Sequence, residues 1–138
     1  MTVPPLPSAT GLGVDLVQVS RFRARQDDSR FLERLFTASE LAAISDGPHR
    51  AARLAARWAA KEACAKALGC GFGELLSWRD IEVIRTGNTP PTLMLTPEAT
   101  KRHGDPTFLL SLSHDGDYAI AVVLLTGRAH EPTWNQIP

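Results

Sequence analysis

The amino-acid sequence predicts an α+β domain in which a mainly antiparallel sheet packs on one long helix. Three observations support this fold class. Residues 11–19 have the pattern of a strand, the alanine-rich stretch 49–68 has that of a single helix, and two later pairs of strand candidates are each joined by a turn-rich segment. Two hairpins and one early strand around a dominant helix favour an antiparallel sheet with the helix on one face.

The chain has the length and composition of one soluble globular domain. It has 138 residues, of which 43% are hydrophobic and 22% are charged, which is enough for one core of ordinary size. We expect the domain to occupy residues 11–127. The proline-rich segment 1–10 is expected to be a flexible N-terminal arm, and 128–138 a loosely packed C-terminal tail.

The first strand candidate, GLGVDLVQV, places Gly13, Asp15 and Val17 on one face, because side chains alternate along a strand. A carboxylate therefore lies within an apolar element. A helical stretch follows, for which Ser20 is a candidate N-cap, and its polar positions hold the densest basic cluster of the chain. The arginines of this cluster are Arg21, Arg23, Arg25, Arg30 and Arg34.

The middle of the chain has clear start and stop signals for helices. Thr37 and Glu40 have the spacing of a capping box at the start of a short helix. The long helix is expected from about His49 to Leu68, and Gly69 is placed as its left-handed stop.

The last third of the chain predicts two antiparallel hairpins. DIEVIR and TLMLT flank the loop TGNTPP, and TFLLSLS and YAIAVVLL flank the turn-rich HDGD. Between the hairpins, Thr96 caps a short helix that has Pro97 at its first position and ends near Gly104.

Charge and cysteine usage narrow the function classes. Fifteen basic residues balance fifteen acidic ones, so no global field favours nucleic acid or a membrane surface. The first residues lack a basic and apolar leader pattern, and no apolar run approaches membrane-spanning length. Cys64 and Cys70 fit neither a disulfide framework nor a zinc site, so we expect reduced thiols and a cytoplasmic protein without membrane or nucleic-acid partners.

The long helix carries the first candidate site, in the sequence RWAAKEACAKALG. Glu62 falls within the apolar stripe of the helix, Lys66 follows one turn later, and Arg57 and Lys61 flank the other edge. One interpretation is a structural Glu62–Lys66 ion pair at i,i+4 spacing. The other adds Asp15 as a second carboxylate, so that both could hold Mg²⁺ while the basic side chains bind a diphosphate.

The sequence SLSHDGD contains a Ser, a His and an Asp, but neighbours on a strand point to opposite faces, so a catalytic triad is not indicated. Ser113 and His114 at a strand end could instead reach a phosphate, or they could be a turn residue and a solvated imidazole. The glycines after the long helix lack the spacing of a P-loop. The other histidines, in polar loop-like stretches, give no functional signal: His49, His103 and His130.

Taken together, these motifs resemble the holo-acyl-carrier-protein synthase family, the small bacterial 4′-phosphopantetheinyl transferases. The matching pieces are GLGVDLVQVSRF, RFLERLFTASEL, LAARWAAKEACAKALGCGF, DIEVI and SLSHDGDYAIAVVLL. They extend from about residue 11 to 125, nearly the whole predicted domain. The strand Asp together with the AAKEA helix is the specific combination, and the Ser-His strand end follows in the same order.

The resemblance implies the 4′-phosphopantetheinyl transferase fold and its reaction. The arm of coenzyme A would pass to a serine of apo acyl carrier protein, in fatty acid or polyketide synthesis, with Mg²⁺ as cofactor and adenosine 3′,5′-bisphosphate as product. A homotrimer with active sites between subunits is implied. By position, the resemblance implies these roles: Asp15 and Glu62 as metal ligands; Lys66 as catalytic together with them; Arg57, Lys61, Lys66, Gly69, Ser113 and His114 at coenzyme A; Arg21 and Arg30 at the carrier protein.

The chain departs from the family pattern at three places. Gln18 stands where an acid is common, Cys70 stands where a threonine is common, and the loop GNTPP lacks the usual lysine. These departures leave open a catalytically weakened module of the same fold that only binds acyl carrier protein. A metal-dependent nuclease is a third interpretation, disfavoured because no basic nucleic-acid surface is evident.

Overall fold

The structure is a computed structural model, and it describes residues 9–128. The predicted arm lies mostly, and the predicted tail almost entirely, outside the described residues, so both stay predictions. The elements, in chain order, are β1 (Gly11–Gln18), α1 (Val19–Arg23), α2 (Ser29–Leu35), α3 (Ala38–Ala43), α4 (Arg50–Leu68), a 3₁₀ turn η1 (Trp78–Asp80), β2 (Ile81–Ile84), β3 (Thr92–Leu95), α5 (Pro97–Arg102), β4 (Thr107–Asp115) and β5 (Tyr118–Gly127).

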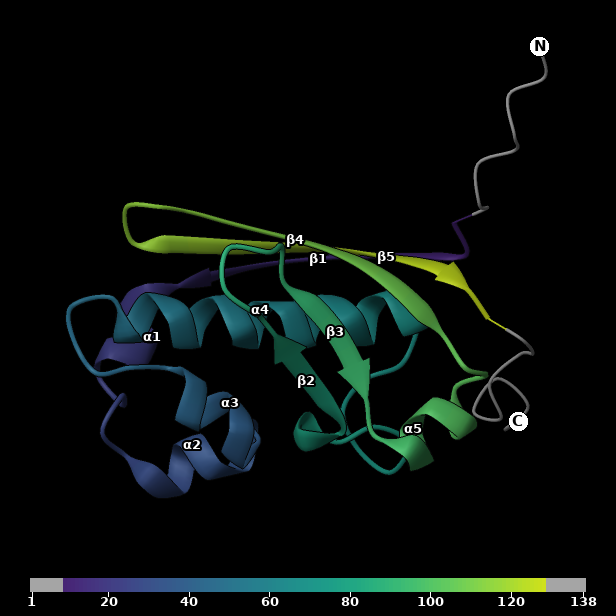
Figure 1. Ribbon diagram of the computed structural model, residues 1–138, viewed down its shortest axis with the longest axis horizontal. Coiled ribbons are helices and arrows are strands. Elements are labelled where there is room, and N and C mark those ends of the chain that lie inside the picture. Colours follow the sequence, from purple (N-terminus) through teal and green to yellow (C-terminus); the bar gives the residue numbers. More distant parts are fainter. Residues whose placement is uncertain (1–8, 129–138) are drawn as a thin grey trace, which may run out of the picture.

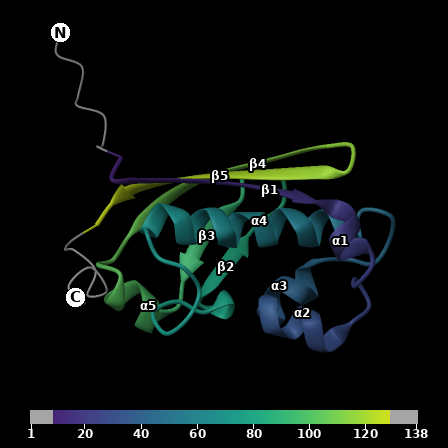
Figure 2. The same ribbon diagram turned by 180° about the vertical axis from the view of Figure 1, so that it is seen from behind.

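The strands form two antiparallel sheets, of which the larger has the order β1-β5-β4 and the smaller pairs β2 with β3. Figures 1 and 2 show α4 running along one face of the larger sheet, with the smaller sheet and the other helices on that same side. The α+β fold class with antiparallel strands packed on one long helix is confirmed.

Close contact between β1 and α4 depends on two glycines. A Cβ atom on Gly13 would overlap the carbonyl oxygen of Ala63, and one on Gly11 would overlap that of Ala67. Only glycine therefore lets the strand lie directly on the helix backbone. The alanines of α4 serve the same purpose on the helix side, since Ala59 and Ala63 are fully buried.

The local signals for helix ends are confirmed. Thr37 and Glu40 form the predicted capping box of α3. The Thr96 side chain caps α5 by accepting a hydrogen bond from the Ala99 N–H. Gly69 ends α4 in the left-handed conformation, with φ of 81°.

The segment after β1 differs from the prediction. It contains two short helices, α1 and α2, and Ser20 does not cap either of them. Asp28 caps α2 by accepting a hydrogen bond from the Phe31 N–H, and the Ser20 N–H donates to Asp117 Oδ1 in the turn between β4 and β5. The acceptor for the first turn of α1 therefore comes from a distant part of the chain, which local sequence spacing does not reveal.

The outer face of the larger sheet is apolar and open. Leu12, Leu16 and Leu109 are 60% to 64% exposed, and the figures show every helix on the opposite face. Within residues 9–128, no helix is long and apolar enough to cross a membrane.

Candidate active site

Asp15 lies on the face of β1 that packs on α4, and its side chain is only 13% exposed. Its Oδ1 atom accepts a hydrogen bond from Lys66 Nζ at 3.2 Å. Its Oδ2 atom is buried and has no hydrogen-bond partner among the described residues. Since a buried carboxylate oxygen without a partner is costly, this atom is suited to a cation or a donor supplied by a ligand.

Glu62 on α4 and Asp15 on β1 form an acidic pair. Burial raises the pKa of Glu62, and the negative charge of Asp15 raises it further, against the opposing charges of Lys66 and Arg21. Burial also raises the pKa of Asp15, although the hydrogen bond from Lys66 lowers it in part. The two carboxylates thus share one weakly hydrated site.

Lys66, in the last turn of α4, ties the helix to β1. Its Nζ atom donates to the Val14 carbonyl at 2.9 Å as well as to Asp15. The ion pair of Lys66 is with Asp15, and none with Glu62 is found in the described part of the chain, so the local i,i+4 interpretation is wrong. About half of the lysine side chain, 53%, remains exposed, so it can also meet an anionic ligand.

The acidic pair fits a divalent cation. Carboxylate oxygens are hard donors, and Mg²⁺ commonly takes one or two of them, with substrate phosphates and water as the other ligands. The unpartnered Oδ2 of Asp15 agrees with this role. Residues 9–128 contain no cluster of three or more His, Cys, Asp or Glu side chains able to hold a metal. Gln18 adds no charge; its amide donates to the Tyr118 hydroxyl at 3.4 Å.

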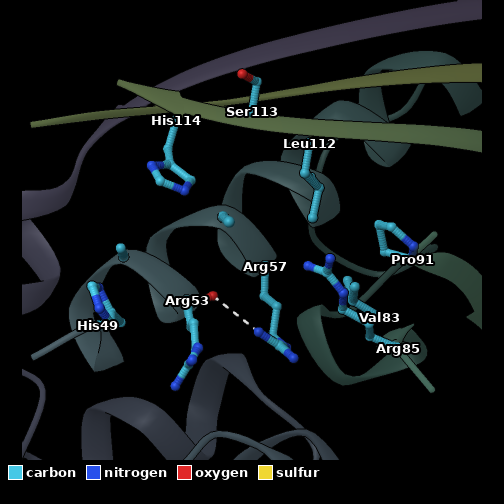
Figure 3. Close-up of a pocket in the computed structure, with 11 residues that line it drawn as sticks. His49, Arg53, Arg57, Val83, Arg85, Pro91, Leu112, Ser113 and His114 are labelled. Carbon is cyan, nitrogen blue, oxygen red and sulfur yellow. Dashed lines mark hydrogen bonds between the residues drawn. The ribbon is translucent and has the colours of Figure 1, made fainter. Parts of the chain in front are cut away.

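A basic pocket of about 500 Å³ lies on another side of α4, below β4 and beside β2 (Figure 3). Burial lowers the pKa of Arg57, the charges of Arg53 and Arg85 lower it further, and Glu40 opposes them. The Arg57 Nε atom is buried and has no partner in the described chain. The lining residues are His49, Ala52, Arg53, Ala56, Arg57, Val83, Arg85, Pro91, Leu112, Ser113 and His114.

Ser113 and His114 point in different directions. His114 faces into the pocket and the Ser113 side chain points away from it (Figure 3). Their strand partners agree, because His114 pairs with the buried Ala119 and Ser113 with the partly exposed Ile120. Of these two predicted ligand-binding residues, only His114 faces Arg57 across the pocket.

Three basic side chains of the pocket had no functional assignment from the sequence: His49, Arg53 and Arg85. Arg53 could have been found, since it precedes Arg57 by one helical turn and shares its side of α4. Arg85 follows β2 and reaches the pocket only through the packing of the β2–β3 hairpin, which sequence spacing does not reveal.

Lys61 does not reach either cluster. Its side chain is fully buried, and its Nζ atom donates to Glu40 at 2.6 Å, to the Ile81 carbonyl at 2.7 Å and to the Trp78 carbonyl at 3.0 Å. On the side of α4 that carries Lys61, the helix is covered by α3 and β2. The sequence had predicted that this side binds a ligand. The ammonium group of Lys61, predicted to contact coenzyme A, therefore binds protein groups and is not accessible to a ligand.

The remaining predicted residues lie near the acidic pair or on the surface. Arg21, on α1, is exposed, and its guanidinium lies 5.2 Å from the Trp58 ring centre. Its charge acts on both Asp15 and Glu62. Arg30 is exposed on α2, and Gly69 follows Lys66 directly at the end of α4.

The acidic pair and the basic pocket lie on opposite sides of α4 within one chain. Arg53 and Glu62 are nine residues apart on this helix, which at about 100° per residue turns one away from the other. Figure 1 has β4 and the β2–β3 hairpin on the near side of α4, and Figure 2, from behind, has β1 there. The acidic pair and the basic pocket of one chain therefore face away from each other across α4.

Comparison with known protein families identifies the class of protein to which this fold and site belong. Residues 11–123 match the 4′-phosphopantetheinyl transferase superfamily, and the chain belongs to it. The resemblance noted in the sequence is confirmed.

Within that superfamily, the similar proteins are holo-[acyl-carrier-protein] synthases, and the predicted enzyme class is confirmed. The synthase of Syntrophotalea carbinolica is 42% identical over 132 residues, which cover 89% of this chain and 100% of that one. The Helicobacter pylori synthase, solved in complex with coenzyme A, has a TM-score of 0.74 at 32% identity and covers 83% and 98%. The Bacillus anthracis synthase, solved with coenzyme A (3′,5′-ADP), has a TM-score of 0.72 at 33% identity and covers 85% and 96%.

Proposed function

We propose that this chain transfers the 4′-phosphopantetheine group of coenzyme A to a serine of apo acyl carrier protein, with Mg²⁺, and releases adenosine 3′,5′-bisphosphate. The observation that carries the proposal is the cluster of Asp15, Glu62 and Lys66, with one unpartnered Asp15 oxygen. Similar synthases solved with coenzyme A support the same co-substrate here.

In this reaction the serine hydroxyl gives its proton to a carboxylate or to water, and its oxygen attacks the phosphorus that bears the pantetheine arm. The bond from that phosphorus to the bridging oxygen breaks, and the bridging oxygen leaves on adenosine 3′,5′-bisphosphate. Mg²⁺, when bound, would neutralise charge on the diphosphate. Asp15 and Glu62 are its proposed ligands, and Lys66 would stabilise negative charge that builds up on the phosphate oxygens.

The basic pocket is suited to the phosphate-rich end of coenzyme A. Arg57 and His114 face one another there, beside Arg53 and Arg85, and guanidinium groups bind phosphate through paired hydrogen bonds. Gly69 and Ser113 remain proposed ligand contacts on the basis of the resemblance.

The exposed arginines Arg21 and Arg30 are proposed to bind the acidic carrier protein. Arg21 lies beside the acidic pair, so a carrier protein bound there would bring its serine toward Asp15 and Glu62. Complementary charge of this kind raises the rate of encounter and orients the partner.

The active assembly is proposed to be a homotrimer with its sites between subunits. The acidic pair and the basic pocket lie on opposite sides of α4, so a second copy would supply the pocket that faces the first copy's carboxylates. The open apolar face with Leu12, Leu16 and Leu109 supports association, because monomers rarely expose a large apolar patch.

The proposed setting is the cytoplasm, with carrier proteins of fatty acid biosynthesis and lipid metabolism as partners. The two free cysteines, Cys64 and Cys70, agree with a reducing compartment.

The test is an intact-mass assay with purified protein, Mg²⁺, coenzyme A and the organism's own apo carrier proteins. We expect the mass increase of one phosphopantetheine arm, and a loss of activity of more than about 100-fold in Asp15→Asn and Glu62→Gln. Circular dichroism should show both variants folded. Carrier binding without any product would favour the alternative of a binding module, and full activity in either variant would remove the metal assignment.

A further inference from the structure

The side chains of Glu40 on α3 and Lys61 on α4 form a completely buried ion pair. Both are 0% exposed, and Lys61 Nζ lies 2.6 Å from Glu40 Oε1. The same Oε1 atom accepts the Thr37 N–H at 2.9 Å in the capping box of α3. The pair therefore joins the start of one helix to the interior of another.

Both members of the pair also bind the chain that enters β2. Lys61 donates to the carbonyls of Trp78 and Ile81, and Glu40 Oε2 accepts the Val83 N–H at 3.0 Å. An ammonium group has three donors, and all three are used. The fold thus fastens residues 78–83 to α3 and α4 by main-chain hydrogen bonds to two buried charges.

Burying the charges of Glu40 and Lys61 costs desolvation free energy, which indicates that the pair has a specific role. Burial lowers the pKa of Lys61, and the charge of Glu40 acts in the opposite direction. A buried ion pair often stabilises a fold no better than apolar side chains of the same volume. Its particular contribution is to fix geometry, because its hydrogen bonds are satisfied in only one arrangement.

The β2–β3 hairpin depends on contacts other than strand pairing to hold it against α4. Among the described strands, β2 and β3 pair only with each other and form no ladder with the larger sheet. Three residues of this segment, Val83, Arg85 and Pro91, nevertheless form a wall of the basic pocket opposite Arg53 and Arg57. The position of Arg85 therefore depends on what holds β2 against α4.

We propose that the Glu40–Lys61 pair positions the β2–β3 hairpin so that Arg85 closes the basic pocket against Arg53 and Arg57. Glu40 and Lys61 are positioning residues, since neither reaches the pocket. The inference rests on the proposed function only for the identity of the ligand, coenzyme A.

The test replaces the pair by neutral side chains of similar size, in Glu40→Gln/Lys61→Met, so that no unpaired charge is left buried. Hydrogen–deuterium exchange should rise in residues 81–84 and 92–95 and stay unchanged in β1, β4 and β5. The dissociation constant for coenzyme A, measured by calorimetry, should rise about tenfold, the scale of one lost charge-assisted contact. The KM for coenzyme A should rise with it, while kcat stays within about twofold.

Two further variants sharpen the result. Arg85→Ala should weaken coenzyme A binding to a similar extent without changing exchange in β2, and it should add little when combined with the double variant. Asp46→Asn, which removes an ion pair to Arg50 whose acid is exposed, is the control and should change neither readout.

Uniformly faster exchange over the whole chain, or an unchanged affinity for coenzyme A, would overturn the positioning role. If wild-type protein binds coenzyme A and the variants show these shifts, but wild type transfers nothing, only the proposed function is refuted. If wild-type protein has no affinity for coenzyme A, both the positioning role and the proposed function are refuted.

Discussion

Asp15 and Glu62 are held where carboxylates are poorly hydrated and close to each other. The pKa of Glu62 is raised first by burial and then by the charge of Asp15. A raised pKa in the folded chain means that the charged form destabilises the fold relative to the unfolded chain. These residues are therefore expected to lower stability in the absence of a bound cation, as functional groups often do.

Removing the Glu62 charge should stabilise the metal-free protein. The stability that a protonated Glu62 gives is complete below the pKa of an unfolded glutamate and is lost as pH rises through the higher folded pKa. In a chelating buffer at pH 7, Glu62→Gln should therefore unfold a few degrees above wild type, and the difference should shrink as pH falls toward about 4. Thermal melts between these pH values measure this effect.

The matched control is Glu74→Gln, because Glu74 is exposed. Its melting temperature should follow wild type throughout. A Glu62→Gln variant that is less stable than wild type at pH 7 would contradict the assignment of Glu62 to a desolvated site.

At the scale of elements, the site depends on β1 lying directly on α4. Asp15 reaches Lys66 because Gly11 and Gly13 allow the strand backbone to approach the carbonyls of Ala67 and Ala63. A side chain at either glycine would push the strand, and the carboxylate with it, away from the helix.

Gly13→Ala should therefore be strongly destabilising. The added methyl group would overlap the Ala63 carbonyl, and overpacking of this kind against backbone costs about 3 kcal/mol or more. Urea unfolding measures the loss. Gly73→Ala is the control, because a Cβ atom there meets nothing within 4 Å, and it should change stability by less than about 0.5 kcal/mol. Equal effects of the two changes would rule out the close approach as the cause.

Elements set by neighbours in sequence could be predicted, and contacts between distant elements could not. Thr37 with Glu40, and Gly69 after the long helix, act within a few residues, so spacing alone identified them. The alternation of β1 likewise placed Asp15 on the same face as Gly13 and Val17, and the structure shows that this face packs on α4. The path of Lys61 depends on α3 and β2 covering a second side of α4, and the place of Arg85 depends on how the hairpin packs. The hydrophobic periodicity of α4 alone therefore predicts neither the burial of Lys61 nor the position of Arg85.

At the scale of the whole molecule, the balanced net charge hides a local asymmetry. Arg21 and Arg30 are exposed on neighbouring helices α1 and α2, although basic and acidic residues balance over the chain. We propose this surface as the docking site for an acidic partner, although Asp27 and Glu33 are exposed on the same segment.

Reversal of both charges, in Arg21→Glu/Arg30→Glu, should raise the KM for acyl carrier protein by about tenfold or more at low salt, because complementary charge guides the encounter. The KM for coenzyme A should stay near its wild-type value. Lys101→Glu is the control, since Lys101 is exposed on α5, far from α2 in both views. A carrier KM that does not move would exclude this surface as the docking site.

The separation of the two clusters by α4 makes a further prediction about assembly. If each active site combines the acidic pair of one subunit with the basic pocket of its neighbour, then Asp15→Asn and Arg57→Ala damage different halves of the same site. Each variant alone should be nearly inactive. Subunits mixed after partial unfolding and refolding should regain activity, because some sites then contain an intact acidic pair beside an intact pocket.

The size of the recovery distinguishes the two arrangements. With random assembly of equal amounts into closed rings, about one quarter of the sites receive both intact halves, so the mixture should reach about a quarter of wild-type activity. The control mixes Asp15→Asn with Glu62→Gln, which damage the same half, and should recover nothing. Sites built within single chains would give no recovery in either mixture, since each chain keeps its own defect. Recovery in the first mixture alone therefore requires that two copies of the chain contribute to one site.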